Sequence, residues 1–538
     1  MTVFNWQQVV EKKRAATKAA VDAYLPAGIL EKLPSEDVVD VSAFVKSLLT
    51  PSQLQLVEGE LDHTLSLLRS GKISATDITK LYITNAAIAH QLCNAITEPN
   101  FDAAVARAAE LDAYRLKNGP IGPLHGLPIT LKDQFKVTGL DTTISYVSLA
   151  GKPATDQSAL VDILESLGAI IIAKTTLPQS IMWCETESPM FGLTTNPRNR
   201  KYTPGGSTGG EAVLLLMGGS PLGWGTDIGG SVRIPSSMTG MVGFKPTSSR
   251  LPYANVEVST DGQEHVPSAV GPMSTTVGGV VTAMKAVLSL DMSHHDPRCP
   301  PITWREERFQ SVFGRKLRIG VLRDDGVVRP HPPIARALDA AVEKLRAAGH
   351  EIVEWDGEYI KQGVDVMDEY YRVDGGEDIR RAIEASGEPY LPRIKMLVEK
   401  APALSVYEYW QVNKEKWDLR QKYLKKWNDA GIDFLLSPVT AHTAAPHRCF
   451  RWIGYTKFWN VMDYPAGTMC VDEVREEDKP TQEWKEYKPR NWLDEWNYNL
   501  YDHENMKGHK VELQIIGRRL EEEMTLGAMK RVEEIIKA

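Results

Sequence analysis

The sequence alternates helical segments with short runs of β-branched residues, and this alternation constrains the fold more than any other feature. Residues 158–176, SALVDILESLGAIIIAKTT, have the pattern of an amphipathic helix, a glycine break and a strand. The same kind of alternation returns over residues 315–355, from RKLRIGVLRD to GHEIVEW. Such alternation predicts an α/β fold: a single large domain with a central twisted mixed β-sheet that helices cover on both faces.

The chain of 538 residues contains no internal repeat and no low-complexity linker. Residues 1–117 are expected to be largely helical, and the last helical pattern there ends at Gly119, a typical stop signal. Residues 470–510 are rich in charge, Trp and Tyr, and we expect an irregular surface excursion there. We expect residues 1–95 to form a helical region that packs on the core formed by residues 96–538.

Composition and charge exclude several classes of partner. The chain carries 62 Lys and Arg against 70 Asp and Glu residues, a net charge of −8, so we expect no basic face for nucleic acid or anionic lipid. The five cysteines lack a CxxC pair, which argues against a disulfide scaffold and favours a reducing compartment. The N-terminus lacks a secretory pattern, and the apolar runs are too short to span a bilayer. We therefore expect a cytoplasmic protein without membrane or nucleic-acid partners.

The segment TDIGGSVRIPSS, residues 226–237, places Ser231 directly after two glycines. Adjacent glycines weaken helices and strands, and they are tolerated where the backbone must come close to another group. The backbone can curl there so that four successive amides point at one spot, those of Ile228, Gly229, Gly230 and Ser231. Such amides would form an oxyanion hole if the Ser231 hydroxyl attacked a carbonyl.

A second glycine-rich segment, PGGSTGGE at residues 204–211, surrounds Ser207 and Thr208. A phosphate loop would need a terminal Gly-Lys-Ser/Thr, which this segment lacks. The core GGSTG fits the G-x-S-x-G nucleophile elbow of α/β-hydrolases, which would make Ser207 the nucleophile. Candidate histidines for that arrangement lie downstream, at His442, His447, His503 and His509. The other interpretation is a glycine-rich turn into the following helix.

A lysine stands inside an apolar strand: residues 122–135, GPLHGLPITLKDQF, contain Lys132. Burial favours the neutral form of a lysine, and a neutral lysine is a usable base near neutral pH. Alternatively, the side chain extends its head to solvent or pairs with a carboxylate. Together with the two hydroxyl-bearing segments, Lys132 indicates a relay in which Ser207 passes a proton between Lys132 and Ser231, and no histidine is required.

Five segments in order resemble the amidase signature enzymes: GPLHGLPITLKD, AKTTLPQS, FGLTTNPRNRKYTPGGSTGGE, GTDIGGSVRIPSS and GMVGFKPT. Later segments, among them DFLLSPVTAHTAAPH and LQIIGRRLEEE, are similar to the C-terminal half of fungal acetamidase-type amidases. The resemblance covers most of the chain and is densest over residues 122–250. It implies that residues 96–538 form the catalytic domain.

The resemblance implies a role for each matching residue. The catalytic lysine of the family falls on Lys132, and its nucleophile falls on Ser231. The bridging serine, which the family holds in a cis peptide, falls on Ser207. The oxyanion amides fall on residues 228–231. The supports of the nucleophile loop fall on Asp227 and Arg233. The substrate-contacting positions fall on Ile181, Gly206 and Thr226. Thr208 stands where the family usually has a second serine, and its hydroxyl is expected to support the site by bonding Lys132. Glu512 stands where a small residue is common.

The activity that the resemblance implies is hydrolysis of a linear carbon–nitrogen amide bond through an acyl-enzyme, with no metal or cofactor. Small aliphatic or aryl amides, acetamide-like, are the expected substrates; esters, anilides and carbamates are alternatives on the same triad. An amidotransferase subunit and a non-catalytic binding protein are less favoured readings, and a homodimer is a possible assembly. Four aromatic residues either line an acyl pocket or belong to the core: Trp452, Phe458, Trp459 and Tyr464.

Overall fold

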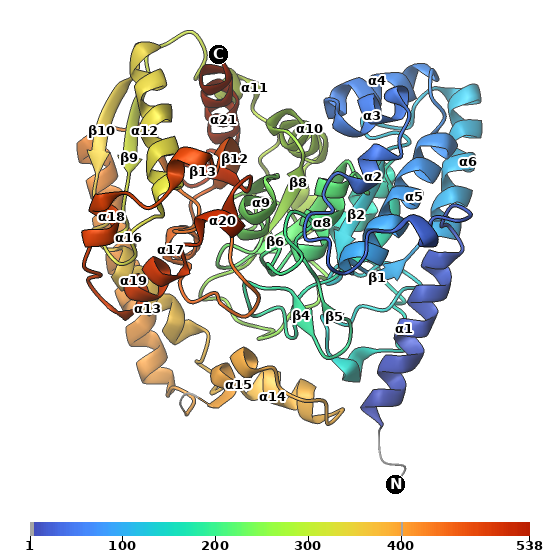
Figure 1. Ribbon diagram of the computed structural model, residues 1–538, viewed down its shortest axis with the longest axis horizontal. Helices are drawn as coiled ribbons and strands as arrows, with labels where there is room; N and C mark the ends of the chain where they lie inside the picture. The colour runs from blue at the N-terminus through green and yellow to red at the C-terminus, as the bar shows by residue number, and fades with distance from the viewer. Residues whose placement is uncertain (1–4, 400–401) are drawn as a thin grey trace.

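The computed structural model describes residues 5–399 and 402–538, and a large mixed β-sheet runs through this part of the chain (Figure 1). The sheet strands are β1 Ile96–Pro99, β2 Pro128–Lys132, β3 Ile170–Thr175, β6 Leu222–Asp227, β7 Val242–Lys245, β8 Ala269–Ser274, β9 Arg318–Leu322, β10 Glu351–Trp355, β11 Phe434–Pro438, β12 Ala466–Glu473 and β13 Lys510–Ile516. Their order is β1-β3-β2-β6-β8-β7-β12-β13-β11-β9-β10. A separate hairpin pairs β4 Glu187–Ser188 with β5 Gly192–Leu193. Strands β2, β3 and β6 run parallel, whereas β6, β8 and β7 alternate in direction, so the sheet is mixed as predicted.

The helices surround this sheet. In chain order they are α1 Trp6–Asp22, α2 Phe44–Ser47, α3 Pro51–Glu58, α4 Leu61–Ser70, α5 Ala75–Cys93, α6 Phe101–Asn118, α7 Ala159–Ser166, α8 Gly209–Met217, α9 Arg233–Thr239, α10 Val277–Val287, α11 Glu306–Gln310, α12 Pro332–Ala347, α13 Ile360–Tyr370, α14 Glu377–Glu384, α15 Pro392–Glu399, α16 Val406–Ala430, α17 Gly454–Met462, α18 Gln482–Glu486, α19 Trp492–Leu500, α20 His503–Met506 and α21 Glu522–Lys537. The prediction of an α/β fold with one extended central sheet is confirmed.

Successive residues of one strand show that helices cover both faces of the sheet. Ile171 of β3 belongs to an apolar cluster that includes side chains of α7, α10, α12 and α21. Ile170 and Ile172 belong to a different cluster, with side chains of α5 and α8. Because neighbouring residues of a strand point to opposite faces, the two clusters lie on opposite sides of the sheet. A strand that is buried on both faces has a continuous apolar sequence, which explains the run AIIIA.

The predicted helix–strand alternation is present where the sequence indicated it. Helix α7 and strand β3 flank Gly168, and α12 lies between β9 and β10. Helix α6 ends at Gly119, which has a positive φ of 79° that favours glycine. The first sheet strand begins at Ile96, and helices α1 to α5 precede it; α5 is buried against α6 and α8. Figure 1 shows these N-terminal helices in blue, beside the end of the sheet that β1 forms.

The expectation of an irregular excursion over residues 470–510 is wrong in part. Strand β12 extends to Glu473, and the segment that follows contains the short helices α18, α19 and α20. Side chains that accept hydrogen bonds from the first turn start these helices, at Thr481, Asn491 and Asp502. The aromatic residues that suggested an exposed segment stack on one another instead, since Trp484 lies against Tyr498 at 5.3 Å between ring centroids.

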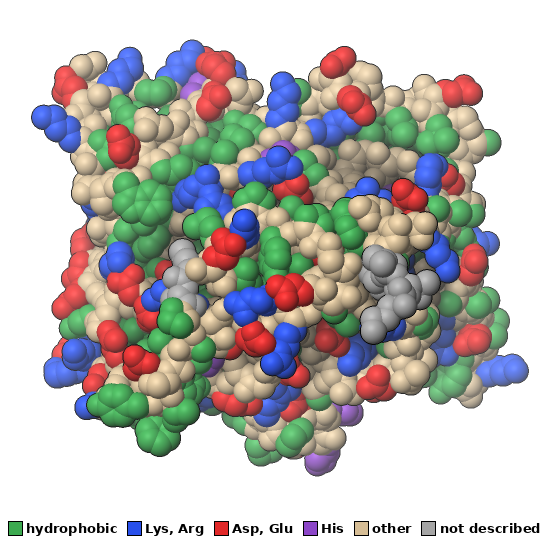
Figure 2. All heavy atoms as spheres, turned by 90° about the horizontal axis from the view of Figure 1, so that it is seen from below, with side chains coloured by type: hydrophobic (Ala, Val, Ile, Leu, Met, Phe, Trp, Pro, Cys, Tyr) green, Lys and Arg blue, Asp and Glu red, His purple; other side chains and the backbone are tan. Residues whose placement is uncertain are grey.

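The molecular surface carries both signs of charge. Figure 2 shows basic and acidic side chains interspersed with hydrophobic ones over the face seen from below. Within the described ranges, the structure contains no helix whose length and apolar character would suffice to cross a membrane.

Candidate active site

Lys132 is the last residue of β2, and its ammonium group is held inside the protein between two hydroxyls. Its Nζ donates to Ser207 Oγ at 2.6 Å and to Thr226 Oγ1 at 3.0 Å, and the side chain is fully buried. Burial lowers the pKa of Lys132 from 10.5 to about 7, although the negative charges of Asp227 and Glu211 raise it in part. The alternative in which the lysine reaches solvent is therefore wrong, and near neutral pH a substantial fraction of the amine is free to accept a proton.

Ser207 lies in the glycine-rich loop that leads into α8, and the peptide bond between Gly206 and Ser207 is cis. The glycines allow close backbone contacts. A Cβ on Gly206 would lie 2.7 Å from the backbone nitrogen of Glu185, and one on Gly205 would lie 2.8 Å from Cα of Pro235. The loop therefore packs against its neighbours without room for side chains at these positions, and it holds the fully buried Ser207 against Lys132.

Ser231 lies in the loop between β6 and α9, next to the loop of Ser207. The backbone amide of Thr208 donates to the carbonyl oxygen of Ser231 at 3.1 Å, so the two loops are joined directly. Ser231 is half-buried and lines a cavity of about 660 Å³, and its Oγ makes no hydrogen bond with any residue that the structure describes. Its hydroxyl is therefore available to a molecule in the cavity, and the structure brings all three segments that carry Lys132, Ser207 and Ser231 together.

A buried ion pair fixes the backbone around Ser231. Asp227 accepts hydrogen bonds from Nε of Arg233 at 3.0 Å and from its Nη2 at 2.9 Å. Both side chains are fully buried, so this is not a surface ion pair. Burial alone would raise the pKa of Asp227, but the charge of Arg233 and its hydrogen bonds hold that pKa well below the ordinary value. Asn460 also accepts from Nη2 at 2.8 Å, and Gln514 accepts from Nη1 at 3.3 Å.

The four predicted oxyanion amides are not equivalent. The amide of Gly230 donates to Asp227 Oδ1 at 2.8 Å, so its inclusion in the oxyanion hole is corrected: it holds the loop instead. The amides of Ile228, Gly229 and Ser231 have no acceptor among the described residues. Gly230 has a φ of 130°, and a Cβ there would lie 2.4 Å from Oγ1 of Thr456, so this position requires glycine.

Thr226 makes the contact with Lys132 that the resemblance gave to Thr208. The hydroxyl of Thr208 is buried without a hydrogen-bond partner, and it does not contact Lys132 as predicted. Thr226 was expected to contact substrate, but it is absent from the cavity wall and bonds Lys132 instead. Its hydroxyl also donates to Oε1 of Gln134 at 2.5 Å, which leaves an oxygen lone pair toward the lysine. Among the three predicted substrate-contacting residues, Ile181 lines the cavity, whereas Gly206 and Thr226 are not among its lining residues.

The cavity in front of Ser231 has an apolar wall near the nucleophile loop and charged residues elsewhere. Its lining includes Ile181, Ile228, Ile234 and Trp452. Trp452 is thus the one of the four predicted aromatic residues found in the cavity wall as the structure describes it. The other three, Phe458, Trp459 and Tyr464, pack in the core. Trp224, just upstream of the nucleophile loop, is also a fully buried core residue.

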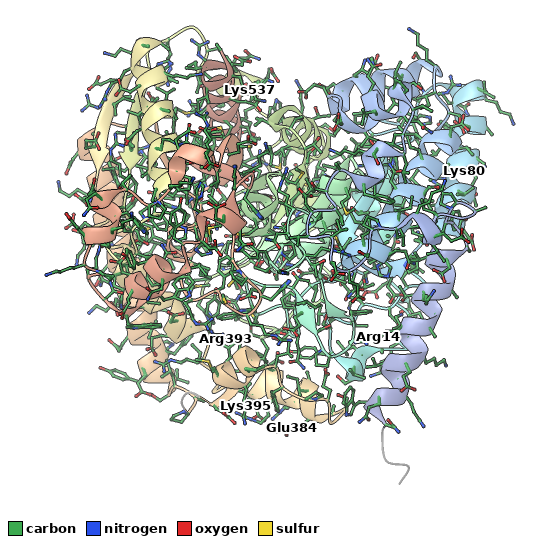
Figure 3. The ribbon with its side chains drawn as sticks, viewed as in Figure 1. Arg14, Lys80, Glu384, Arg393, Lys395 and Lys537 are labelled. Carbon is green, nitrogen blue, oxygen red and sulfur yellow. The ribbon has the colours of Figure 1, made fainter. Side chains whose placement is uncertain are left out.

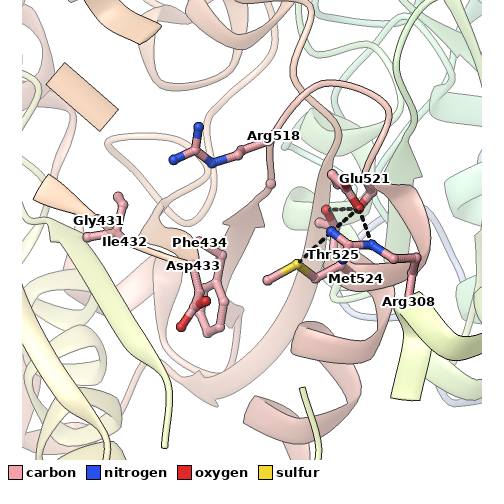
Figure 4. A pocket seen from close by; sticks show the side chains of 10 residues that line it. Arg308, Gly431, Ile432, Asp433, Phe434, Arg518, Glu521, Met524 and Thr525 are labelled. Carbon is pink, nitrogen blue, oxygen red and sulfur yellow. Dashed lines mark hydrogen bonds and ion pairs between the residues drawn. The ribbon is translucent and has the colours of Figure 1, made fainter. Parts of the chain in front are cut away.

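A second cavity, of about 310 Å³, lies beside β11 and α21 (Figure 4). Its charged Arg308 is already paired with Glu521 at 2.8 Å. None of its described lining residues is a serine, cysteine or lysine, so it offers no nucleophile with a base. The cavity at Ser231 is therefore the better candidate for the active site.

Several residues that support the site were missed by the sequence analysis. Glu211 is fully buried in α8, where it accepts hydrogen bonds from Thr130 at 2.5 Å and Thr175 at 2.9 Å. Burial raises the pKa of Glu211 to about 8. The hydroxyl of Tyr371 would lie 2.7 Å from a Cβ on Gly229 and borders the same cavity. Only Glu211 lies in a segment quoted for its motif; nothing in the sequence marks Tyr371.

The histidines that an α/β-hydrolase would need lie elsewhere. The ring of His442 bonds the side chain of Asn497 at 3.2 Å, and those of His447 and His503 bond backbone oxygens. His509 stacks on Tyr202. No histidine among the described residues bonds Ser207, whose hydroxyl accepts from Lys132 instead. The described residues therefore do not supply the histidine partner that the nucleophile-elbow interpretation of Ser207 requires.

The sequence and the structure were compared with those of known proteins, and the matches define the class of protein. The family model described as Amidase matches residues 77–526. Amidase 1 of Gibberella moniliformis is 44% identical over 99% of both chains, and an acetamidase of Emericella nidulans is 36% identical over 99% of this chain and 98% of its own. A solved structure named fatty acid amide hydrolase is 30% identical with a TM-score of 0.93, over 99% of this chain and 95% of that chain.

The fold and these likenesses together define an amide hydrolase. The chain belongs to the amidase family, and the resemblance to amidase signature enzymes of fungal acetamidase type is confirmed.

Proposed function

We propose that the chain hydrolyses linear amides by a Ser-Ser-Lys mechanism with Ser231 as nucleophile, Ser207 as proton relay and Lys132 as base. The observation that carries this proposal is the buried hydrogen bond of 2.6 Å between Lys132 Nζ and Ser207 Oγ. A lysine whose pKa is lowered to about 7 holds a proton loosely enough to exchange it at neutral pH. The free hydroxyl of Ser231 on the cavity wall supports its role as the attacking group.

In the first step, Ser231 gives its proton to Ser207, which passes its own proton to the neutral amine of Lys132. Ser231 Oγ bonds to the amide carbon, and the carbonyl electron pair becomes an oxyanion. The amides of Ile228, Gly229 and Ser231 are the donors that would stabilise this charge, and one such donor is typically worth about 3 kcal/mol in the transition state. Positioning of these donors before the reaction depends on the ion pair between Asp227 and Arg233.

In the second step, the proton returns from Lys132 through Ser207 to the amide nitrogen. The carbon–nitrogen bond then breaks, ammonia or an amine leaves, and an ester to Ser231 remains. Water gives a proton to the same relay and attacks the ester, which releases a carboxylic acid and restores the Ser231 hydroxyl. In each half-reaction Lys132 first accepts one proton and then returns it, so its protonation state is the same at the start and at the end.

We propose aliphatic or aryl amides as the substrates, from the small acetamide-like amides that the resemblance implies to larger amides that would fill the cavity. A cavity of about 660 Å³ falls within the roughly 300–1,000 Å³ typical of pockets for drug-sized ligands, far above the need of a four-atom amide. The names of an acetamidase relative and of fatty acid amide hydrolase are consistent with amides that range from small to extended. Esters, anilides and carbamates are further substrates that the same acyl-enzyme chemistry permits.

The proposal is tested with a panel of primary amides, anilides, esters and carbamates, together with a fluorophosphonate probe and peptide mapping. We expect turnover of amides in the panel and a label on Ser231. The Ser231→Ala variant should lose both, whereas a variant at the unpartnered Cys449, Cys449→Ala, should keep both and serves as a control. A label on Ser207 instead of Ser231 would overturn the assignment, and an inert panel would favour a binding protein.

A further inference from the structure

The cavity at Ser231 carries an excess of positive charge. Its basic lining residues are Lys361, Arg372, Arg393, Arg451 and Lys457. Its acidic lining residues are Asp365 and Asp368. This local excess occurs in a chain whose net charge is −8, so the composition of the whole protein does not account for it. A positively charged cavity attracts and retains an anionic ligand.

Three of the five cations are already neutralised by neighbouring carboxylates. Lys361 pairs with Asp365 at 2.6 Å and Lys457 pairs with Asp368 at 2.7 Å. Arg372 pairs with Glu369, one turn earlier on the chain. Arg393 and Arg451 remain, and neither forms an ion pair with any carboxylate of the described residues. The unneutralised charge of the cavity is therefore carried by these two arginines.

Arg393 is held over the cavity by an aromatic ring. It lies on α15, and Figure 3 shows it on the side toward the body of the molecule, with Lys395 and Glu384 on the outer side. Its guanidinium carbon lies 5.2 Å from the ring centroid of Trp183, another residue of the cavity wall. The ring attracts the cation and holds it in place. Nη1 donates to the sulfur of Met396 at 3.7 Å, and Nε and Nη2 have no hydrogen-bond partner among the described residues.

Arg451 is held by the backbone of its own loop. Its Nη1 donates to the carbonyl oxygens of Arg448 at 3.0 Å and of Phe450 at 2.8 Å. These two bonds occupy one nitrogen, and Nε and Nη2 have no partner among the residues that the structure describes. A guanidinium has five N–H donors, and two of its nitrogens together match the two oxygens of a carboxylate. Arg451 is half-buried, so a charge placed against it is only partly screened by water.

We propose that the cavity selects amides that carry a carboxylate remote from the scissile bond, and that Arg393 and Arg451 bind this carboxylate. This inference rests on the proposed function of Ser231. Ile228 and Ile234, which lie on either side of Ser231 in the sequence, line the same cavity as the two arginines, so we expect the part of the substrate between the amide and the carboxylate to be an alkyl or aryl spacer. With the carboxylate on the acyl side of the amide, this substrate class is the half-amides of dicarboxylic acids.

The test compares primary amides of two matched series, one ending in a carboxylate and one ending in a methyl group, with spacers of increasing length. For the best spacer, the wild-type protein should show a kcat/KM at least about tenfold higher for the carboxylate, and this ratio should fall as ionic strength rises. Arg393→Gln and Arg451→Gln should each raise KM for the carboxylate about tenfold and leave the methyl series unchanged. Lys395→Gln is the matched control, because Lys395 lies on the same helix as Arg393 but does not line the cavity and pairs with Glu399 on an exposed face; it should change neither series by more than about twofold.

Binding of the same carboxylates is measured in parallel by calorimetry on the Ser231→Ala variant, so that the result does not depend on turnover. The inference is supported if the variant binds the carboxylate at least about tenfold more tightly than the methyl analogue and loses this preference on adding Arg393→Gln. Equal affinity for the two series overturns it. If methyl-ended amides are hydrolysed at Ser231 without a carboxylate preference, this inference fails and the proposed function stands. If no amide is hydrolysed while the binding preference persists, the proposed function fails and the anion subsite stands.

Discussion

The replacement Asp227→Asn removes the charge of a fully buried ion pair, and its cost can be worked out from the structure. The carboxylate accepts from two guanidinium nitrogens of Arg233, from the amides of Gly230 and Val232 and from Asn460. An amide group retains one oxygen but directs its own N–H toward the guanidinium, so Arg233 stays buried without a counter-charge. Breaking one partner of such a pair typically costs about 3–5 kcal/mol.

In a chain of this size, this loss of unfolding free energy lowers the melting temperature Tm only modestly. An unfolding entropy of about 2.1 cal/mol/K per residue gives roughly 1.1 kcal/mol/K for 538 residues. A loss of about 4 kcal/mol therefore lowers Tm by about 3–4 °C. The measurement is thermal unfolding followed by circular dichroism, with Asp429→Asn as the control, because Asp429 pairs with Lys425 on an exposed helix face and its loss should cost under about 1 kcal/mol. A Tm of Asp227→Asn within 1 °C of the wild type would refute the reasoning.

The pH dependence of this difference has a definite sign. Because the folded state holds the pKa of Asp227 below its ordinary value of 3.8, the carboxylate stabilises the protein fully above about pH 4. The contribution is lost as the pH falls further, through the lower pKa of the folded state. The gap in Tm between wild type and Asp227→Asn should thus stay constant from about pH 5 to 8 and narrow only below about pH 4. A gap that already closes at pH 6 would mean that another group controls it.

Three further predictions concern the loops around Ser231. Thr226→Val removes the second acceptor of Lys132 and leaves Oε1 of Gln134 without its donor, so kcat should fall at least about tenfold. Thr208→Val should keep kcat within about threefold, because that hydroxyl has no partner; steady-state kinetics on one amide decide, and equal losses would contradict the assignment. Gly230→Ala places a Cβ 2.4 Å from Thr456 Oγ1 at a φ of 130°, so we expect a lower Tm and at least about 100-fold less turnover, and normal values for both would contradict the loop geometry. The kcat/KM for a neutral amide should fall as the pH drops below about 7, where Lys132 becomes protonated, and a profile flat down to pH 5 would exclude the lysine as base.

The sequence was informative where a single segment determines the answer. The run AIIIA predicts a strand buried on both faces because its neighbours in sequence are all apolar, and β3 has this form. Lys132 and the two serines could be nominated because each stands in an unusual local context: a charge in an apolar strand, or a hydroxyl among glycines. The distance of 2.6 Å between Lys132 Nζ and Ser207 Oγ agrees with the predicted relay. This contact needs only that β2 and the glycine-rich loop meet.

The details that sequence reasoning missed depend on contacts between distant segments. Strands β2 and β6 pair in parallel with Leu131 opposite Trp224, and this register brings Thr226 rather than Thr208 to Lys132. A shift of one residue would turn the Thr226 side chain to the other face, and no local pattern specifies that register. Asn460 reaches Arg233 from a helix 227 residues away in the chain. Which amide of the nucleophile loop is engaged depends in turn on how Asp227 is oriented.

The most direct test of the central claim is the rate at which a fluorophosphonate phosphonylates Ser231 with loss of fluoride, measured against pH in the wild type and in Lys132→Met. The account predicts a rate that rises through a midpoint near pH 7, set by the lysine, and then levels, and a variant that is slower by about 10²–10⁴-fold at every pH above the midpoint. A wild-type rate that does not change between pH 5 and 9, or a variant that is labelled as fast as the wild type, would contradict the claim that Lys132 activates the nucleophile.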